Sequence, residues 1–261
     1  MAMSHPSDFS PTTRFSDRAE DYAKYRPTYP QAAIDWIIEE MGLPNTLRIA
    51  DLGAGTGIAS RLFAERGAQV VAVDPNPEML ALAKRHTRIR FATGTAEQTG
   101  LPASSFDLVT VFQAFHWFKP EPTMAEFRRI LKRRGRIAAV GNSRDYQDAF
   151  TLEYSKLIES FSDEAKAVER GRGVGPVAET FEQGGFERVQ RREFRHFHRM
   201  DEESFIGYAR SASYLPRDGA GYNRLRAGLG AIYARHADTQ GYVVFPYLTK
   251  VFRGDRTTPR K

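Results

Sequence analysis

The stretch Leu47-Arg48-Ile49-Ala50-Asp51-Leu52-Gly53-Ala54-Gly55-Thr56-Gly57 joins a short apolar run to a carboxylate and then to three alternate glycines. Glycine lets the backbone approach a ligand where a Cβ would clash. A second apolar run, Val70–Val73, ends at Asp74, about 20 residues downstream, where nucleotide-binding α/β folds place an acid for ribose hydroxyls. We interpret the two runs as neighbouring strands that carry a nucleoside site.

Details of the glycine loop favour a cationic nucleoside over a dinucleotide. Ile58 occupies the position at which the dinucleotide fingerprint has its third glycine. Asp51 would place a negative charge near the ligand, which disfavours a pyrophosphate and favours a ligand with an ammonium and a sulfonium group. S-adenosylmethionine is such a ligand, and NAD-dependent oxidation is the rival interpretation.

Five motifs occur in the order found in class I S-adenosylmethionine-dependent methyltransferases, and over residues 20–142 the sequence resembles that family. The motifs are Asp51–Gly57, Asp74–Leu80, Gly94–Glu97, Phe106–Val109 and Leu131–Arg136. The segments Phe15–Tyr22, Tyr25–Pro30 and Phe115–Phe118 resemble the small-molecule branch that includes trans-aconitate methyltransferases. An ordered set of motifs is more specific than the glycines alone.

Hydrophobic periodicity predicts an α/β fold with a parallel sheet covered on both faces. Strands are expected at 47–51, 70–74, 89–92, 106–112 and 136–140, and helices at 32–41, 57–66, 77–85 and 122–132. The resemblance implies a Rossmann-like, mostly parallel seven-stranded sheet with an antiparallel last strand and a helical cap over the site. It divides the chain into an N-terminal segment and lid (1–30), an S-adenosylmethionine-binding core (31–144), and the remaining sheet with cap insertions (145–261).

The second half of the chain mixes helical and extended patterns. Helices are expected at 149–168, 177–183, 201–214 and 222–235, and extended runs at 187–199 and 242–252. Pro246 should interrupt the last run or place it at an edge. The resemblance implies that the last two strands lie at the sheet edge and that segments 145–185 and 200–240 stand over the site.

Composition restricts the chemistry and the compartment. The 261 residues include no cysteine, which excludes disulfides, thiolate metal ligands and a cysteine nucleophile. The chain opens without a signal-peptide pattern, has no apolar run long enough to cross a bilayer, and has a mean hydropathy of -0.50. We therefore expect a cytoplasmic protein without a membrane partner, either a monomer or a homodimer.

A formal net charge of +6 leaves room for acidic substrates or nucleic acid. Six basic residues follow an amphipathic helix and flank a glycine, where a solvated face and helix end are expected: Arg128, Arg129, Lys132, Arg133, Arg134 and Arg136. Arg253–Asp255 should belong to a basic, frayed tail. No RNA-binding module or amino-directed nucleic-acid methylation motif is present, so we expect no nucleic-acid partner.

The resemblance assigns the cofactor site residue by residue. Gly53, Gly55 and Gly57 would approach the methionine portion, Asp74 would bind the ribose hydroxyls, and the backbone at Gln113 and Ala114 would touch the cofactor. Adenine would lie near Ala96 and Glu97, with Met79 as a polarizable wall. The expected cofactor-binding set is Asp51, Gly53, Gly55, Gly57, Asp74, Pro75, Met79, Ala96, Glu97, Gln113 and Ala114. The cofactor would leave as S-adenosylhomocysteine.

The acceptor is expected to meet the methyl group after the fourth strand. There His116 would act as a general base, or would only hydrogen-bond and pack beside Trp117. The resemblance makes the segment before the first strand a lid over the cofactor. Basic side chains crowd the predicted strand at 187–199, where they either face inward toward an anionic acceptor or mostly form a solvated face: Arg188, Arg191, Arg192, Arg195, His196, His198 and Arg199. The expected substrate-binding set is Tyr22, Tyr25, Arg26, Tyr29, His116, Trp117, Tyr208 and Tyr214.

For the acceptor atom we favour an oxygen of a small, anionic carboxylic acid, because the resemblance includes carboxyl methyltransferases and the cap is basic. A phenol, amine or carbon acceptor, a nucleic acid, and a non-catalytic cofactor-binding module are the alternatives. His196 and His198 share one strand face, but no third ligand is apparent. We therefore expect no metal.

Overall fold

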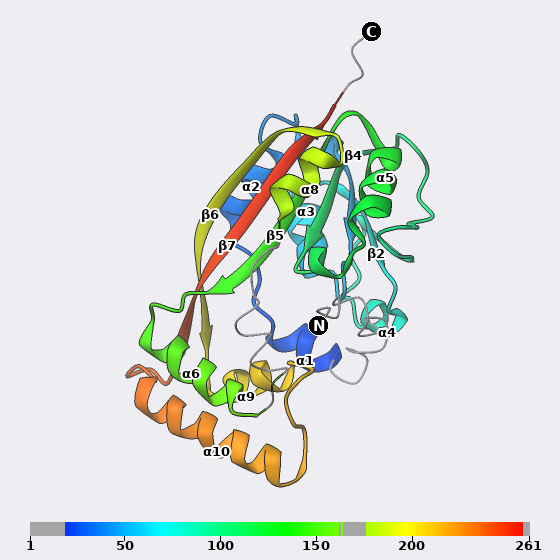
Figure 1. Cartoon of the computed structure of the whole chain (residues 1–261). Coiled ribbons are helices and arrows are strands. Elements are labelled where there is room, and N and C mark those ends of the chain that lie inside the picture. The colour runs from blue at the N-terminus through cyan, green and yellow to red at the C-terminus, as the bar shows by residue number, and fades with distance from the viewer. Residues whose placement is uncertain (1–18, 162, 164–175, 258–261) are drawn as a thin grey trace, which may run out of the picture.

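A seven-stranded sheet in the order β3-β2-β1-β4-β5-β7-β6 organises the molecule (Figure 1). The computed structural model describes residues 19–161, 163 and 176–257, without the side chains of Ala19 and Tyr22. The strands are β1 (Arg48–Leu52), β2 (Gln69–Asp74), β3 (Ile89–Thr93), β4 (Phe106–Phe112), β5 (Leu131–Arg144), β6 (Phe186–Met200) and β7 (Val243–Arg256).

Strands β1 to β5 pair in parallel, and β7 is antiparallel to both of its neighbours, β5 and β6. This confirms the expected Rossmann-like fold and its antiparallel last strand. The strand order reverses between β1 and β4, which creates the crevice at the carboxyl ends where ligands bind in such sheets.

Helices cover both faces of the sheet because strand residues alternate between two apolar cores. In β5, Ala138 and Val140 belong to the core under α2 and α3, whereas Ile137 and Ala139 belong to the core under α5 and α8. The helices are α1 (Ala19–Tyr25), α2 (Gln31–Ile38), α3 (Ile58–Glu65), α4 (Pro77–Ala81), α5 (Pro120–Ile130), α6 (Ala149–Glu159), α8 (Val177–Gln183), α9 (Glu202–Arg210) and α10 (Gly219–His236). Two short 3-10 turns are η3 (Pro44–Thr46) and η4 (Phe115–Trp117).

A third apolar core lies beyond the carboxyl ends of the parallel strands and forms the cap. It joins α6, α9 and α10 around the first residues of β7, where Phe245 is fully buried. Figure 1 shows these helices together below the sheet, with α1 beside α9. Helix α8 was expected in this cap but packs on the sheet instead, because Phe181 buries its ring against Phe115 and Phe186.

Strand β5 begins at Leu131, where the sequence predicts the last turn of a helix. Leu131 is fully buried and pairs with Phe106, so a sheet contact that is distant in sequence overrides the local helical pattern. Of the six basic residues expected at a helix end, only Arg128 and Arg129 are helical. The expected helix at 149–168 ends at Glu159, and residues 162 and 164–168 lie outside the described part.

The expectation that Pro246 interrupts its strand or places it at the edge is wrong, because β7 runs unbroken through Pro246 and lies between β5 and β6. The Pro246 carbonyl accepts the Asp145 amide at 2.8 Å, just past the end of β5. In a strand, the N–H and C=O of one residue point to the same side, so an N–H at Pro246 would also point toward Asp145. Since β5 ends at Arg144, the N–H that proline lacks costs no hydrogen bond to that strand. Arg253–Asp255 lies within this strand, not in a frayed tail, because Asp255 pairs with Arg136 of β5.

No helix within 19–161 or 176–257 combines the length and the apolar character needed to cross a membrane.

Candidate functional site

A cleft of about 180 Å³ opens at the carboxyl ends of β1, β2 and β4. Of the residues expected to bind the cofactor, nine line it: Gly53, Gly55, Asp74, Pro75, Met79, Ala96, Glu97, Gln113 and Ala114. Three of the motifs and the segment after β4, which are separated along the chain, therefore form one surface.

The glycine loop forms one wall of the cleft and has no room for side chains. Gly53 has a φ of +66°, and a Cβ there would stand 2.6 Å from the Cβ of Ala114. Gly55 has a φ of +55°, and its Cβ would stand 3.1 Å from Cε of Met79. Glycine is required for both the left-handed backbone and the close approach. Gly57 is the N-cap residue before α3 and does not line the cleft, since a Cβ there would meet the Phe91 ring at 3.0 Å.

Asp74 ends β2 at the rim of the cleft, and two backbone amides fix its carboxylate. One oxygen accepts the Gly55 N–H at 2.8 Å, and the other accepts the Asn76 N–H at 2.9 Å. Burial raises the pKa of Asp74, and these two amide hydrogen bonds oppose the rise. Since each carboxylate oxygen has more than one acceptor site, the group can still accept two ligand hydroxyls.

Asp51 does not line the cleft. It is fully buried beneath the loop, where its oxygens accept the Ser60 hydroxyl at 2.5 Å and the Thr110 hydroxyl at 2.9 Å. Burial raises the pKa of Asp51 to about 6, and the nearby charge of Asp74 adds to the rise. Asp51 therefore ties β1 to α3 and β4, and any field it exerts on a ligand acts from below the loop.

The side of the cleft assigned to adenine combines an apolar wall with a helix start. Met79 is buried in α4, which begins at Asn76, whose side chain accepts the Glu78 and Met79 amides. Glu97 accepts the Lys119 amide at 3.0 Å and the Thr123 hydroxyl at 3.5 Å. Glu97 thus satisfies donors at the start of α5 while it lines the cleft.

His116 and Trp117, neighbours in the segment after β4 that were both expected to bind the substrate, differ in their relation to the cleft. Trp117 lines the cleft, but His116 is exposed and is not among the lining residues. The two rings lie 4.8 Å apart. Gln113 has a φ of +57°, a left-handed conformation that is uncommon outside glycine. The side-chain amide of Gln113 donates to the Asn142 carbonyl at 3.1 Å. The strained residue of this segment therefore sits on the cleft wall.

The residues expected in a lid pack onto the sheet and the cap. Tyr29 is buried against Phe112, with ring centroids 4.6 Å apart. Tyr25 donates its hydroxyl to Glu203 at 2.9 Å, and Arg26 donates to the Ser211 carbonyl at 3.2 Å. None of these three lines the cleft. Residues 1–18 of the expected lid and the side chain of Tyr22 in α1 lie outside the described part.

The substrate residues expected from the cap lie in its aromatic core. Tyr208 is buried and accepts the Tyr247 hydroxyl at 2.7 Å, and Tyr214 is half-buried against the same core. His198 of β6 faces these rings, and burial lowers its pKa to about 4, with His196 and Arg26 contributing. His198 is therefore uncharged at neutral pH. No cluster of three potential metal-binding side chains occurs in the described ranges.

Sequence reasoning did not assign individual roles to Asn76, Thr95, Phe112 and Phe118, which also line the cleft. Asn76 was detectable, because Asn followed by Pro is a strong helix-start signal at the end of a strand. Phe112 and Phe118 were recognised only as part of an aromatic segment. Which of its rings face the ligand depends on the 3-10 turn at 115–117.

The chemical groups that line the cleft match the adenosyl and amino-acid parts of S-adenosylmethionine. It offers an unobstructed loop backbone, a carboxylate on the rim, and the apolar side chains of Met79 and Trp117. Its volume is below the ~300 Å³ at which small-molecule pockets begin. We therefore expect Met79, whose Cε leans over Gly55, to move when a ligand enters.

Comparisons with known proteins agree with this geometry. Residues 50–139 match a family model described as a methyltransferase domain. An uncharacterized methyltransferase of Mycobacterium bovis is 39% identical over 145 residues, covering 55% of this chain and 58% of the relative. A methyltransferase-like protein of Schizosaccharomyces pombe is 37% identical over 153 residues, covering 58% of this chain and 60% of the relative. The matches thus span less than two thirds of these relatives' length.

Solved structures extend the likeness to most of the chain. A candidate type II methyltransferase of Anaeromyxobacter dehalogenans has a TM-score of 0.62 and 27% identity, covering 89% of this chain and 97% of that one. A phosphoethanolamine N-methyltransferase of Haemonchus contortus, solved with S-adenosylhomocysteine, has a TM-score of 0.57 and 16% identity. That match covers 99% of this chain and 61% of the other, and at this identity it supports the fold alone.

Proposed function

We propose that this protein methylates a carboxylate oxygen of a small molecule. Its domain match, its relatives and its fold support its assignment as a class I S-adenosylmethionine-dependent methyltransferase. When bound, the cofactor supplies a methyl group on a positively charged sulfur. The chain's own residues would hold the two reactants in contact and keep water away.

The observation that carries the proposal is the shared rim of Gly55 and Asp74. The Gly55 amide donates to the Asp74 carboxylate, which joins the glycine loop directly to the end of β2. In the proposed complex Asp74 accepts the ribose hydroxyls, the glycine loop lies along the methionine portion, and Met79 contacts the adenine or the ribose. Asp51 keeps the loop in place through Ser60 and Thr110.

The wall toward the cap connects the cleft to positively charged side chains. The side-chain amide of Gln113, which lines the cleft, donates to the Asn142 carbonyl, and the side-chain amide of Asn142 donates to the Thr28 carbonyl at 3.2 Å. Thr28 lies two residues after Arg26, and Arg144 lies two residues after Asn142 on the same strand. Arg26 lies over the Tyr208 ring and Arg144 over the Tyr154 ring, at 5.6 and 4.7 Å. Neither arginine lines the cleft, but both lie within two residues of this hydrogen-bonded chain, and their positive charge supports an anionic acceptor.

A carboxylate acceptor needs no general base, because it is already ionised at neutral pH. The cleft supports this, since His116 is exposed and does not line it. Methylation of a phenol, amine or carbon atom is the alternative, and it would require a proton acceptor for the group that loses a proton.

The test is a screen of carboxylic acids, phenols and amines with cofactor labelled in the methyl group, read by mass spectrometry of the products. We expect a labelled ester that releases methanol on mild alkaline hydrolysis. A label that is stable to alkali would assign the methyl group to nitrogen, carbon or a phenol and would overturn the carboxylate assignment. Binding of S-adenosylhomocysteine without turnover on any acceptor class would contradict the enzymatic proposal.

A further inference from the structure

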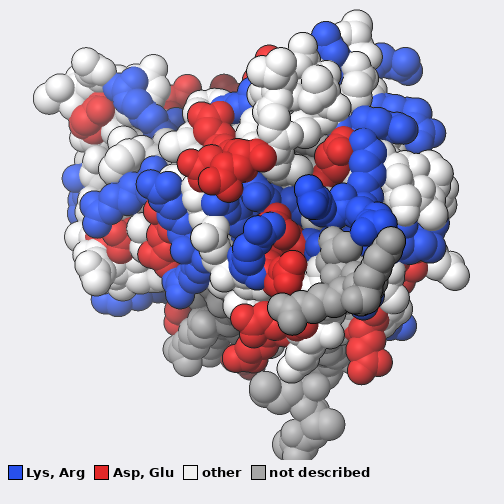
Figure 2. Space-filling model, turned by 90° about the horizontal axis from the view of Figure 1, so that it is seen from above, with Lys and Arg blue, Asp and Glu red and all other residues white. Residues whose placement is uncertain are grey.

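A second pocket, of about 450 Å³, lies at the opposite end of the sheet from the cofactor cleft. Its walls come from the start of β5, the start of β6 and the end of β7, with Glu40 and Met41 after α2. Figure 2 views this end from above and shows lysine and arginine side chains across the middle of the face. Pockets that bind small molecules typically enclose ~300–1000 Å³.

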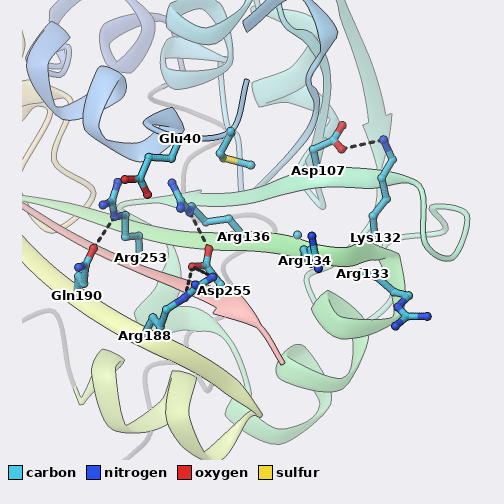
Figure 3. Close-up of a pocket in the computed structure, with 12 residues that line it drawn as sticks. Glu40, Asp107, Lys132, Arg133, Arg134, Arg136, Arg188, Gln190, Arg253 and Asp255 are labelled. Atoms are coloured by element: carbon cyan, nitrogen blue, oxygen red, sulfur yellow. Dashed lines mark hydrogen bonds and ion pairs between the residues drawn. The ribbon is translucent and has the colours of Figure 1, made fainter. Parts of the chain in front are cut away.

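Positive charge exceeds negative charge among the residues that line this pocket. The cationic residues are Lys132, Arg133, Arg134, Arg136, Arg188 and Arg253, and the acidic ones are Glu40, Asp107 and Asp255. Asp255 accepts from both Arg136 and Arg188 at 2.9 Å, and Asp107 accepts from Lys132 at 2.8 Å. These bonds use two of the three carboxylates to orient cations, as Figure 3 shows.

Arg133 and Arg134 make no ion pair with an acidic side chain in the part of the chain that the structure describes. Both are exposed and follow directly on Lys132 at the start of β5. In the view of Figure 3, Arg134 is drawn between Arg136 and Arg133, and the side chain of Arg133 points away from Asp255. They are the guanidinium groups of the pocket that remain available to an external anion.

The pocket floor is built from buried arginines, whose positive charge is costly to bury. Arg136 is 7% exposed and donates to the Ile37 and Glu39 carbonyls at 3.0 and 2.7 Å. Arg253, also 7% exposed, donates to the Trp36 carbonyl and to Gln190. Burial lowers the pKa of Arg253 and the charge of Arg136 lowers it further, while the ion pair with Glu39 at 3.3 Å opposes the drop. A bound anion would relieve this repulsion.

Backbone strain is concentrated at the same place. Five residues other than glycine have positive φ in the described ranges, and three of them line this pocket. They are Glu40 at 65°, Arg134 at 63° and Arg188 at 53°. Left-handed backbone at a non-glycine residue is costly and persists where the surrounding structure enforces it, often at ligand sites.

We propose that this basic pocket binds a compact phosphorylated molecule, of the charge of a pyrophosphate or nucleoside diphosphate. Guanidinium groups match phosphate geometry with paired hydrogen bonds, and one phosphate carries enough charge for several of them. The concave shape and the acidic side chains between the basic ones in Figure 2 favour a small ligand over a nucleic-acid strand. The pocket shares no lining residue with the cofactor cleft.

The test is calorimetric titration of inorganic pyrophosphate into the full-length chain saturated with S-adenosylhomocysteine, so that the cleft is occupied. We expect a dissociation constant below about 1 mM. The double variant Arg133→Gln/Arg134→Gln should weaken binding at least tenfold, and so should Arg188→Gln. The matched control, Arg224→Gln/Arg226→Gln on α10 at the other end of the molecule, removes the same charge and should leave binding unchanged.

Three outcomes of the titrations with small anions would overturn the proposal. These are no binding of pyrophosphate, equal weakening by the α10 control, and citrate binding as tightly as pyrophosphate, which would show a general anion effect. Tighter binding of a single-stranded oligonucleotide than of pyrophosphate would assign the surface to nucleic acid instead. Titration of S-adenosylhomocysteine into the same variants should give wild-type affinity, so failure here is distinguishable from failure of the proposed methyl transfer.

Discussion

The ring of Tyr25 in α1 packs directly onto Gly207 of α9, so that a Cβ at residue 207 would stand 2.2 Å from Cε2 of the ring. The Tyr25 hydroxyl also donates to Glu203 one turn earlier on α9. The segment that precedes the sheet is thus attached to the cap by a ring that fits only over a glycine.

Gly207→Ala should lower the free energy of unfolding by about 1–3 kcal/mol, because the methyl group and the Tyr25 ring cannot occupy the same space. The control is Gly230→Ala in α10, where a Cβ would meet no atom within 4 Å. There alanine should stabilise the helix by roughly 0.5–1 kcal/mol. Urea unfolding of both variants measures the two effects, and effects of the same sign would contradict the packing described above.

Asp74→Asn should weaken S-adenosylhomocysteine binding by about 10- to 150-fold, which corresponds to the ~1.5–3 kcal/mol of hydrogen bonds to a charged group. The substitution keeps the shape of the side chain but removes the charge and one acceptor oxygen. Asp35→Asn, at a surface ion pair with Arg66, removes the same charge and should leave affinity unchanged. Calorimetry with both variants checks this, and an unaltered affinity in Asp74→Asn would remove Asp74 from the proposed site.

Asp51→Asn should change the pH dependence of stability. The folded pKa of about 6 lies above the ordinary 3.8, so the stabilising contribution of Asp51 is complete below pH ~4 and is lost as the pH rises to ~6. The loss amounts to about 3 kcal/mol. The variant should therefore gain about that much relative to wild type between pH 4 and pH 7. Urea unfolding of both proteins across this range measures the difference, and a difference independent of pH would contradict the raised pKa.

His116→Ala should retain at least a third of the wild-type rate with the acid identified by the acceptor screen, because the exposed imidazole is not needed as a base for an ionised acceptor. Its neighbour Trp117 lines the cleft, so Trp117→Ala should weaken S-adenosylhomocysteine binding roughly tenfold or more. The measurement is the initial rate together with cofactor affinity for both variants. A rate loss above a hundredfold in His116→Ala, with cofactor affinity intact, would favour an acceptor that needs deprotonation.

Much of the sheet was predictable because its signals are local. The runs ending at Asp51 and Asp74 are apolar, short and followed by turn residues, and β1 and β2 lie within one residue of where they were expected. The helix over Val177–Gln183 was placed at its observed bounds, but its position on the sheet was not predicted. An apolar face shows that a helix will be buried, but not which core it will join.

The orientation of individual side chains was not predictable. Trp117 and His116 are adjacent in sequence, yet only Trp117 lines the cleft, because a 3-10 turn sets their directions. Arg136 and Arg253 are distant in sequence and similar in type to the exposed Arg133 and Arg134. The end of α2 covers the first two, whose guanidinium groups donate to the Ile37, Glu39 and Trp36 carbonyls, whereas Arg133 and Arg134 stay exposed.

The sequence by itself therefore determined the order of strands and helices, the glycine turn and the acid that ends β2, because backbone preference and hydrophobic period act over a few residues. Only the tertiary structure decided that Asp51 lies beneath the loop, that Tyr25 joins α1 to α9, and that arginines from three strands share one pocket. Those positions depend on contacts between elements that are separated along the chain, which no local pattern specifies.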